Sequence, residues 1–441
     1  MRTPRRQMAS IWLVLGVALL LGLAACGGDD EPEGAADTAT EGTEISGDLS
    51  VVINWTGSEL EAFQAVVDGF TEANPDVNVE LVQIPFEELN AQLTQQFAAG
   101  SPPDVTVALP GLIRQLAAQD FLMPVDDLWD GWIEEGVYNE SLRTIASTTD
   151  GTAYGTWFKG NVNALIWYKP AQLEELGIEP AETWEEFTAA ADTAKAEGLE
   201  PFAVGGADQW PLTQWWDPIL LRVGGLEAFN GLVDGTVGWD DPRVVESFEL
   251  YGDLIANYFP DNALDRGFID ATCAWADGTA AFQNQGAFIS LVAPGECNPD
   301  FVPGEDFTFF LMPAVDESQP LPQAISGDLF AVAKDTENPD AAKALVAYLG
   351  SADSQAIWAE RGGFIAPNAD VPLDVYPNEV DRQAAELWPR EADALAGYDL
   401  DDFIGGEIQS TFREALQQFV RDQDVDRIVE TMTQVDTRAG G

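Results

Sequence analysis

The sequence contains no histidine among its 441 residues, and this absence excludes several mechanisms. A Ser-His-Asp triad, a Cys-His pair and an imidazole-held zinc site all require histidine. Basic residues are also few, because 20 Lys and Arg accompany 76 Asp and Glu, for a formal charge of −56. A surface of that sign repels the phosphate backbone of nucleic acids, so we expect no nucleic-acid partner. We also expect no cofactor.

Hydrophobic residues, in contrast, are plentiful. They make up 46% of the chain, and aromatic residues make up 10%. This composition provides a large core and excludes a disordered acidic tail. A chain of this length predicts two or more lobes.

The N-terminus has the pattern of an export signal. Three arginines among the first six residues precede an apolar run over residues 11–23. The following Leu-Ala-Ala-Cys resembles the lipobox of bacterial lipoproteins, which implies a signal peptide over residues 1–25 and a lipid on Cys26. The alternative is a transmembrane anchor, although about 13 apolar residues are short for a span of roughly 20. Residues 26–47 are polar and acidic, which predicts a flexible tether.

The other two cysteines are Cys273 and Cys297. Disulfides persist in exported proteins, so we predict that these two cysteines are paired. The bond would close a loop of about 25 residues and stabilise the fold by about 3 kcal/mol. Two buried free thiols are the alternative.

Strands and helices alternate after the tether. β-branched and apolar residues predict strands over 48–54, 77–84 and 104–109. Apolar residues at helical spacing predict helices between them, over 58–74 and 86–100. This order predicts a parallel sheet that is covered on both faces.

Two further local patterns bear on the site and on the helix ends. In parallel sheets, ligands bind beyond the carboxyl ends of the strands, which here are residues 54–59 and 109–114. Ser58 and Glu61 have the spacing of a capping box at the start of a helix, as do Thr183 and Glu186 in the second half of the chain.

Short motifs in a fixed order resemble those of a known family. They are Phe-Thr-Glu-Ala-Asn-Pro-Asp-Val-Asn-Val at 70–79, Pro-Asp-Val at 103–105, Leu-Met-Pro-Val-Asp at 122–126, Asp-Gly-Thr-Ala-Tyr-Gly at 150–155, Leu-Ile-Trp-Tyr-Lys at 165–169, Thr-Trp-Glu-Glu-Phe at 183–187, Asp-Gly-Thr-Ala-Ala-Phe at 277–282, Asn-Pro-Asp-Ala-Ala-Lys at 338–343 and Gly-Gly-Phe-Ile-Ala-Pro at 362–367. Together they resemble the extracellular solute-binding proteins of ABC importers, in the carbohydrate-type, maltose-binding-like branch (family 1).

The resemblance implies the type II periplasmic-binding fold, an α/β fold with two lobes, a ligand cleft between them and crossing hinge segments. It implies an N-terminal lobe over 48–158 plus 326–378 and a C-terminal lobe over 159–325 plus 379–441. The implied function is that of a receptor, not an enzyme, which captures its ligand by lobe closure and delivers it to a membrane permease. Such a receptor would be a monomer, held by its lipid at the extracellular face of the membrane or in the periplasm.

Aromatic and polar side chains beside turns are the candidate ligand contacts. A pyranose has apolar C–H faces and a rim of hydroxyls, which flat rings and polar acceptors match. With so few basic residues, a neutral mono- or oligosaccharide is favoured over an anionic ligand. The candidate residues are Trp55, Ser58, Glu59, Trp157, Asn161, Asp208, Trp210, Trp216, Phe288, Gly327, Asp328 and Arg361. Replacing Trp55 or Trp210 by alanine is expected to weaken binding and to leave the fold intact.

Three other interpretations stay open at this point. The same rings and acids could cage a cation, as in a polyamine or betaine receptor. A secreted glycoside hydrolase needs only a pair of carboxylates, although with 76 acids such pairs carry little information. Asp126, Asp127 and Asp130 suggest calcium, but their spacing is not that of a calcium-binding loop, and we predict no metal site.

Overall fold

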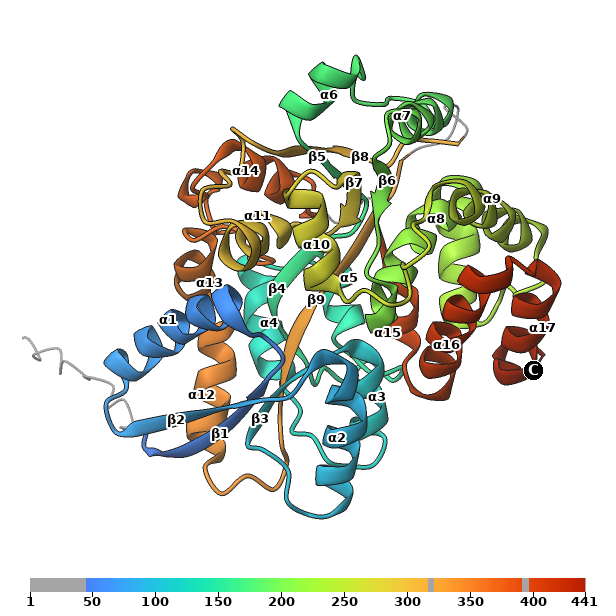
Figure 1. The fold of residues 1–441 in the computed structure, drawn as a ribbon. Coiled ribbons are helices and arrows are strands. Elements are labelled where there is room, and N and C mark those ends of the chain that lie inside the picture. The colour runs from blue at the N-terminus through green and yellow to red at the C-terminus, as the bar shows by residue number, and fades with distance from the viewer. Residues whose placement is uncertain (1–44, 316–320, 391–395, 441) are drawn as a thin grey trace, which may run out of the picture. The chain divides into compact units, whose positions relative to one another are not determined.

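The computed structural model describes residues 45–315, 321–390 and 396–440. Its fold is mixed α/β with two sheets (Figure 1). The predicted signal peptide, Cys26 and nearly all of the predicted tether lie outside the described residues. Within the described ranges, no helix is both long and apolar enough to cross a membrane.

The larger sheet has six strands and forms the centre of the first lobe. Its order is β10-β9-β3-β1-β2, with β4 also paired to β9. The strands are β1 (Gly47–Ile53), β2 (Val77–Gln83), β3 (Val105–Ala108), β4 (Thr156–Val162), β9 (Gln323–Val332) and β10 (Ala396–Tyr398). The predicted strands of the N-terminal region are thus confirmed, with β1 parallel to both β2 and β3.

The parallel pairing predicted for these three strands is confirmed, but the sheet as a whole is mixed, because β9 runs antiparallel to β3 and to β4. The reason is the path of the chain. β9 enters this sheet only after the chain has passed through the second sheet, so no crossover from a neighbouring strand fixes its direction. β4 leads directly into the second sheet, and β9 returns from it, so these two paired strands connect the lobes.

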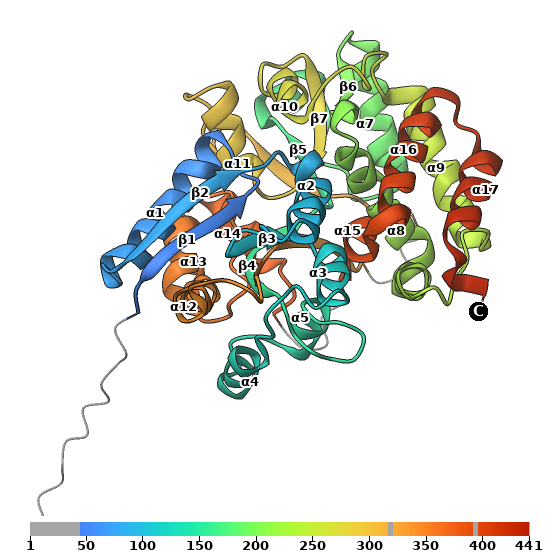
Figure 2. The same ribbon diagram turned by 90° about the horizontal axis from the view of Figure 1, so that it is seen from below.

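Helices α1 (Gly57–Ala73) and α2 (Phe86–Ala98) follow the first two strands (Figure 2). The predicted apolar face of α1 is confirmed, since Phe63, Val66, Val67 and Phe70 are all buried. The remaining helices and turns of this lobe are α3 (Pro110–Ala117), α4 (Asp126–Glu135), α5 (Glu140–Ile145), α12 (Pro339–Leu349), α13 (Ala352–Ala359), η3 (Leu373–Val375) and α14 (Glu379–Glu386).

The smaller sheet has four strands in the order β6-β7-β5-β8 and forms the centre of the second lobe. The strands are β5 (Leu165–Tyr168), β6 (Glu200–Ala203), β7 (Ala280–Gln285) and β8 (Thr308–Leu311). Around them lie α6 (Pro170–Leu176), α7 (Trp184–Ala196), η1 (Gly206–Asp208), α8 (Trp210–Asp234), α9 (Pro242–Tyr258), α10 (Phe268–Ala276), α11 (Ile289–Val292), η2 (Ala293–Cys297), α15 (Leu400–Ile404), α16 (Gly406–Asp422), α17 (Val425–Val435) and η4 (Thr437–Gly440). The lobe boundaries given in the sequence analysis stay a prediction.

Helix caps and the disulfide test three local predictions. The capping box of Thr183 and Glu186 is present at the start of α7. The one predicted for Ser58 and Glu61 is absent, because α1 begins one residue earlier and its N-cap residue is Thr56. Cys273 and Cys297 form the predicted disulfide, which links the end of α10 to η2.

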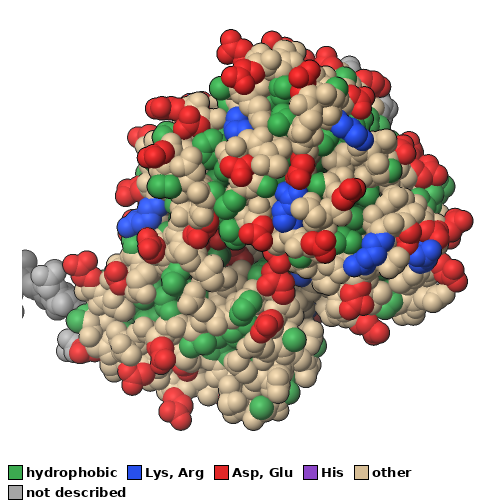
Figure 3. Space-filling model, viewed as in Figure 1, with side chains coloured by type: hydrophobic (Ala, Val, Ile, Leu, Met, Phe, Trp, Pro, Cys, Tyr) green, Lys and Arg blue, Asp and Glu red, His purple; other side chains and the backbone are tan. Residues whose placement is uncertain are grey.

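Acidic side chains are spread over the face of the molecule seen in Figure 3, and basic ones are fewer and scattered between them. Such a surface favours solubility and self-repulsion and says little about the ligand.

Candidate ligand-binding cleft

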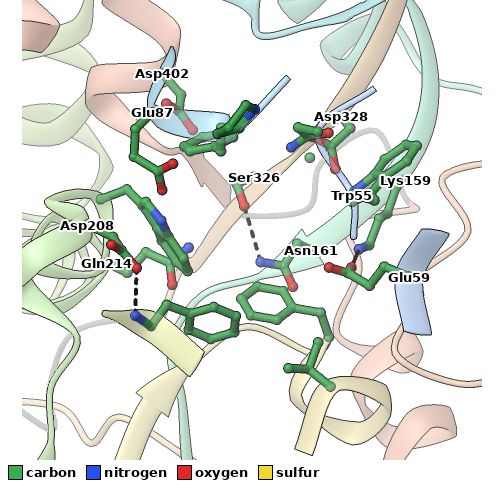
Figure 4. Close-up of a pocket in the computed structure, with 18 of the residues that line it drawn as sticks. Trp55, Glu59, Glu87, Lys159, Asn161, Asp208, Gln214, Ser326, Asp328 and Asp402 are labelled. Atoms are coloured by element: carbon green, nitrogen blue, oxygen red, sulfur yellow. Dashed lines mark hydrogen bonds and ion pairs between the residues drawn. The ribbon is translucent and has the colours of Figure 1, made fainter. Parts of the chain in front are cut away.

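A cavity of about 330 Å³ lies where segments of the two lobes meet, within the range of small-molecule sites (Figure 4). On the first lobe it is lined by the segments that follow β1, β2 and β3, as expected for the carboxyl ends of parallel strands. On the second lobe the starts of α8 and α10 and the α11–η2 segment line it. The middle of β9 and the α15–α16 region complete the lining.

Trp55 forms the wall of the first lobe and is held from behind by other aromatic rings. Its centroid lies 4.9 Å from that of Phe63 and 5.0 Å from that of Trp358, which it meets edge-on. Only 3% of Trp55 is exposed. The ring therefore offers the cavity a rigid but nearly buried surface.

Lys159 on β4 brings a positive charge to this wall. Its ammonium pairs with Glu59 and lies 4.7 Å from the ring centre of Trp358 and 5.7 Å from those of Trp55 and Phe288. The ammonium of Lys159, a cation of the protein itself, thus occupies the aromatic cage that these three rings form.

Asp328 on β9 lies close to this ion pair (Figure 4). Burial raises the pKa of Asp328 to about 6, and the charge of Lys159 partly opposes that rise. Near pH 6, Asp328 can therefore serve as either a donor or an acceptor of hydrogen bonds.

The wall of the second lobe is built around Trp210, the first residue of α8. Its ring lies 5.1 Å from that of Phe268, 6.1 Å from Phe86 and 6.2 Å from Phe288. Asp208 orients this wall, since its Oδ2 accepts a hydrogen bond of 2.6 Å from the backbone N–H of Phe268. Trp210 is only partly buried, so its ring is more available to a ligand than that of Trp55.

Asn161 and Gly327 form part of the cavity floor, where β4 and β9 pair. The Asn161 side chain donates to Ser326 Oγ at 3.2 Å and accepts from the backbone N–H of Ala287 at 2.8 Å. At Gly327 a Cβ atom would lie 2.2 Å from the carbonyl oxygen of Lys159. Only glycine permits this close approach of the two strands.

Three polar atoms of the lining are buried and have no hydrogen-bond partner among the described residues: Asn54 Oδ1, Ser58 Oγ and Gln214 Oε1. Buried polar atoms are normally paired, so an unpaired set around one cavity suggests that a ligand supplies the partners. Two of the three are amide oxygens, which accept but do not donate. A ligand that carries hydroxyl groups satisfies all of them.

The predicted residues that line the cavity are Trp55, Ser58, Glu59, Asn161, Asp208, Trp210, Phe288, Gly327 and Asp328. The backbone N–H of Ser58 also connects to the second lobe, because it donates a hydrogen bond to Glu296 Oε1 at 3.0 Å.

The structure does not bring Trp157, Trp216 or Arg361 to the cavity. Trp157 is fully buried, and its ring donates to the carbonyl of Leu142. A register shift between Trp157 and Lys159 breaks the strand alternation, so Trp157 does not face the same way as Lys159.

Trp216 and Arg361 lie away from the cavity for different reasons. Trp216 lies six positions after Trp210, on another side of α8, where it stacks on Phe248 in the second-lobe core. Arg361 is exposed, and its guanidinium donates to the carbonyl of Ile357.

Sequence reasoning did not select several lining residues, among them Phe86, Lys159, Gln214, Phe268 and Arg413. For two of them a signal was available. Gln214 is four residues after Trp210, hence on the same face of a helix, and Lys159 is two residues before Asn161 on the same strand. Phe268 and Arg413 reach the cavity only because the tertiary fold brings distant segments of the chain together.

Two α/β lobes, crossed by paired strands and enclosing a polar and aromatic cavity, define a solute receptor of the type II periplasmic-binding fold. The chain matches the family of bacterial extracellular solute-binding proteins over residues 55–356, well over half of its length. It belongs to this family. The family is extracellular, which indicates a location in the periplasm or on the outer face of the cytoplasmic membrane, and its members are binding proteins rather than enzymes.

Curated relatives and solved structures agree with this assignment. The osmoprotective compounds-binding protein GgtB of Synechocystis sp. is 25% identical over 413 residues, covering 90% of this chain and 95% of that protein. The alpha-glucosides-binding periplasmic protein AglE of Rhizobium meliloti is 29% identical over 375 residues, covering 79% and 78%.

Among solved structures, the bacterial solute receptor AcbH, which prefers β-D-galactopyranose, has a TM-score of 0.77 at 22% identity, covering 89% of this chain and 98% of that one. The GacH receptor of Streptomyces glaucescens has a TM-score of 0.75 at 20% identity, covering 90% and 99%. At these identities the two structures show the fold.

Proposed function

We propose that this protein is a sugar-binding receptor of an ABC importer, which binds a neutral mono- or oligosaccharide between its lobes and presents it to a membrane permease. The observation that carries the proposal is the set of unpaired buried oxygens that line the same cavity as Trp210. A ring available for stacking, in one cavity with Asn54 Oδ1, Ser58 Oγ and Gln214 Oε1, matches a pyranose ring with its hydroxyl rim. The names of AglE and AcbH, which bind sugars, support the same class of ligand.

The charges in the cleft favour a neutral ligand over a cationic one. Lys159 already fills the cage of Trp55, Trp358 and Phe288. Glu59 pairs with that lysine, and Asp402 pairs with Arg413. These two acids of the lining are therefore engaged with the protein's own cations.

Binding by lobe closure requires only that the closed form bind the ligand more tightly than the open form. The hydrogen bond from Ser58 N–H to Glu296 already connects the lobes across the cavity. We further propose that a lipid on Cys26 keeps the receptor, as a monomer, close to its permease.

A ligand screen by thermal unfolding tests the proposal. Sugars, polyols, betaines and polyamines are added to the purified protein, and a ligand at 100 times its Kd should stabilise the fold by about 2.7 kcal/mol. We expect a sugar to succeed. Success of a betaine or polyamine with failure of every sugar would overturn the proposal in favour of a receptor for compatible solutes, the class that the name of GgtB suggests.

Ionic strength and turnover provide two further tests. Binding of a neutral sugar should barely change with salt, whereas capture of a cation by carboxylates should weaken strongly. Incubation with oligosaccharides should leave them intact, and their hydrolysis at a useful rate would indicate a glycoside hydrolase instead. Loss of membrane association in Cys26→Ser would support the anchor, and full retention would contradict it.

A further inference from the structure

Four aspartates form a buried cluster beside the cavity floor. Asp217 lies on α8, and Asp399, Asp401 and Asp402 lie at the start of α15; they are 0%, 3%, 1% and 7% exposed. One carboxylate oxygen from each of the last three lies within 4.8 Å of the others. Asp217 faces the same segment, since its Oδ2 accepts from the backbone N–H of Leu400 at 3.0 Å.

The cluster contains far more negative than positive charge. Arg413 donates to Asp401 at 2.6 Å and to Asp402 at 2.7 Å, and the salt bridges found for this cluster in the described chain come from this residue alone. With all four carboxylates ionised, the single guanidinium would leave three negative charges uncompensated. Burying unpaired charge costs several kcal/mol per ion, so the four can be ionised together only with a positive partner in addition to Arg413.

Two oxygens of the cluster also lack hydrogen-bond donors. Asp217 Oδ1 and Asp401 Oδ1 are buried, and in the part of the chain that the structure describes neither has a hydrogen-bond partner. The remaining oxygen of each residue is engaged, with Leu400 N–H in one case and with Arg413 and Gln409 in the other.

We propose that Asp217, Asp399, Asp401 and Asp402 bind a divalent cation of the calcium type. Calcium takes oxygen ligands at about 2.3–2.6 Å, so two ligands of one ion lie at most about 5 Å apart, as one oxygen each of Asp399, Asp401 and Asp402 do. Asp217 lies beside these three, since it accepts from the backbone N–H of Leu400 between them. Hard carboxylate oxygens without nitrogen or sulfur donors favour calcium over zinc. Magnesium retains several of its waters and demands a near-ideal octahedron, which suits a crowded buried cluster less well.

The position of the ion gives it a role in the cleft. Asp399 and Asp402 line the cavity, and Asp217 belongs to α8, the helix that carries Trp210. Bound calcium would tie α15 to α8 and fix the floor beneath the ligand. Calcium binding at this cluster is separate from sugar binding, so it can be tested without a sugar.

Calcium titration of the purified protein tests the site. The protein is stripped with a chelator, then titrated with CaCl₂, MgCl₂ or NaCl at matched ionic strength, and binding is followed by calorimetry and by thermal unfolding. We expect one saturable calcium site, with a Kd of about 10⁻⁴–10⁻³ M as in extracellular modules, and a raised Tm. Magnesium and sodium should have much smaller effects.

Asp217→Asn is the informative variant, because the amide oxygen can still accept from Leu400 N–H and the Arg413 pairs are untouched. Its Kd for calcium should rise about tenfold or more, since carboxylate count sets the affinity. Asp127→Asn is the matched control: Asp127 belongs to another aspartate-rich helix start, in α4, but its side chain is 64% exposed and pairs with Lys343. It should leave calcium binding unchanged.

Two results would overturn the proposal: no saturable calcium effect on the unaltered protein, or equal calcium affinity in Asp217→Asn and the unaltered protein. If Asp217→Asn does not fold, Asp399→Asn replaces it, with the same expected loss. Unchanged calcium affinity in that variant would likewise place the ion elsewhere.

Discussion

The cleft wall of the first lobe is held by aromatic packing, whereas the wall of the second lobe combines aromatic contacts with a disulfide and with polar contacts. Trp55 packs against four aromatic rings, those of Phe63, Phe158, Phe330 and Trp358, and is almost entirely buried. Trp210 is partly buried and packs against rings from other segments of the cleft.

The second wall depends on α10 and η2, which carry Phe268 and Glu296 respectively. The disulfide of Cys273 and Cys297 joins these two elements. Trp55 and Trp210 were equivalent candidates in the sequence, but they differ in the structure. Trp55 is a packing residue that also lines the cavity, whereas the partly buried ring of Trp210 is more accessible to a ligand.

Replacing Trp55 by alanine should destabilise the protein. Loss of a fully packed tryptophan from such a cluster costs about 3–5 kcal/mol in the free energy of unfolding. This expectation revises the earlier one that the fold would stay intact. Denaturant unfolding without ligand measures it, with Trp55→Phe as the milder control. A loss below about 1 kcal/mol would show that the first wall tolerates a cavity and that the contrast between the walls is false.

Replacing both Cys273 and Cys297 by serine should lower the free energy of unfolding by about 3 kcal/mol, because the open loop gains entropy in the unfolded chain. Ligand affinity should also fall, since the second wall loses the link between α10 and η2. Reductant should destabilise the unaltered protein to the same extent and leave the double variant unchanged. An unaltered affinity would mean that the bond supports the lobe but not the wall.

Replacing Trp210 by alanine should weaken sugar binding by about 2 kcal/mol, roughly 30-fold in Kd, as for aromatic anchors of binding sites. Stability should fall much less than in Trp55→Ala, because the ring is only partly buried. Calorimetric titration with the sugar found by screening measures the affinity, and Trp210→Phe should retain part of it. Full affinity in Trp210→Ala would make this ring a packing residue as well.

The sequence predicted much of the fold because strands, amphipathic helices and turns are local patterns. The strands and helices up to residue 109 and the capping box at Thr183 follow from neighbours a few positions apart. Trp210 and Asp208 were found because they lie beside a turn, and the fold places them at the cavity.

The failures have non-local causes. Trp157 does not reach the cavity because of the bulge in β4. Trp216 does not reach it because it lies on another side of α8 than Trp210. The return of β9 in the opposite direction, and the approach of Arg413 to Asp401 and Asp402, depend on contacts between distant elements. No spacing within the sequence encodes these contacts.

Replacing Asp328 by asparagine should change how stability depends on pH at the first wall. The folded pKa of Asp328, about 6, lies above the unfolded value of about 3.9, so the folded state retains the proton longer. The free energy of unfolding contributed by this group therefore falls as pH rises from about 4 to about 6. Asp328→Asn should remove that fall and, relative to the unaltered protein, gain about 1 kcal/mol across the window, a value reduced because Lys159 and solvent screen the charge.

Asp150 provides a control of opposite sign. Hydrogen bonds from Thr148 and Thr152 lower its pKa, so its contribution to stability is present above the unfolded pKa and lost as pH falls. Relative to the unaltered protein, Asp150→Asn should thus lose stability as pH rises, where Asp328→Asn gains it. Denaturant unfolding of both variants at pH 4, 5, 6 and 7 compares the slopes. Parallel slopes in the two variants would mean that Asp328 is ionised throughout, and that the charge of Lys159 stabilises the ionised carboxylate at the first wall.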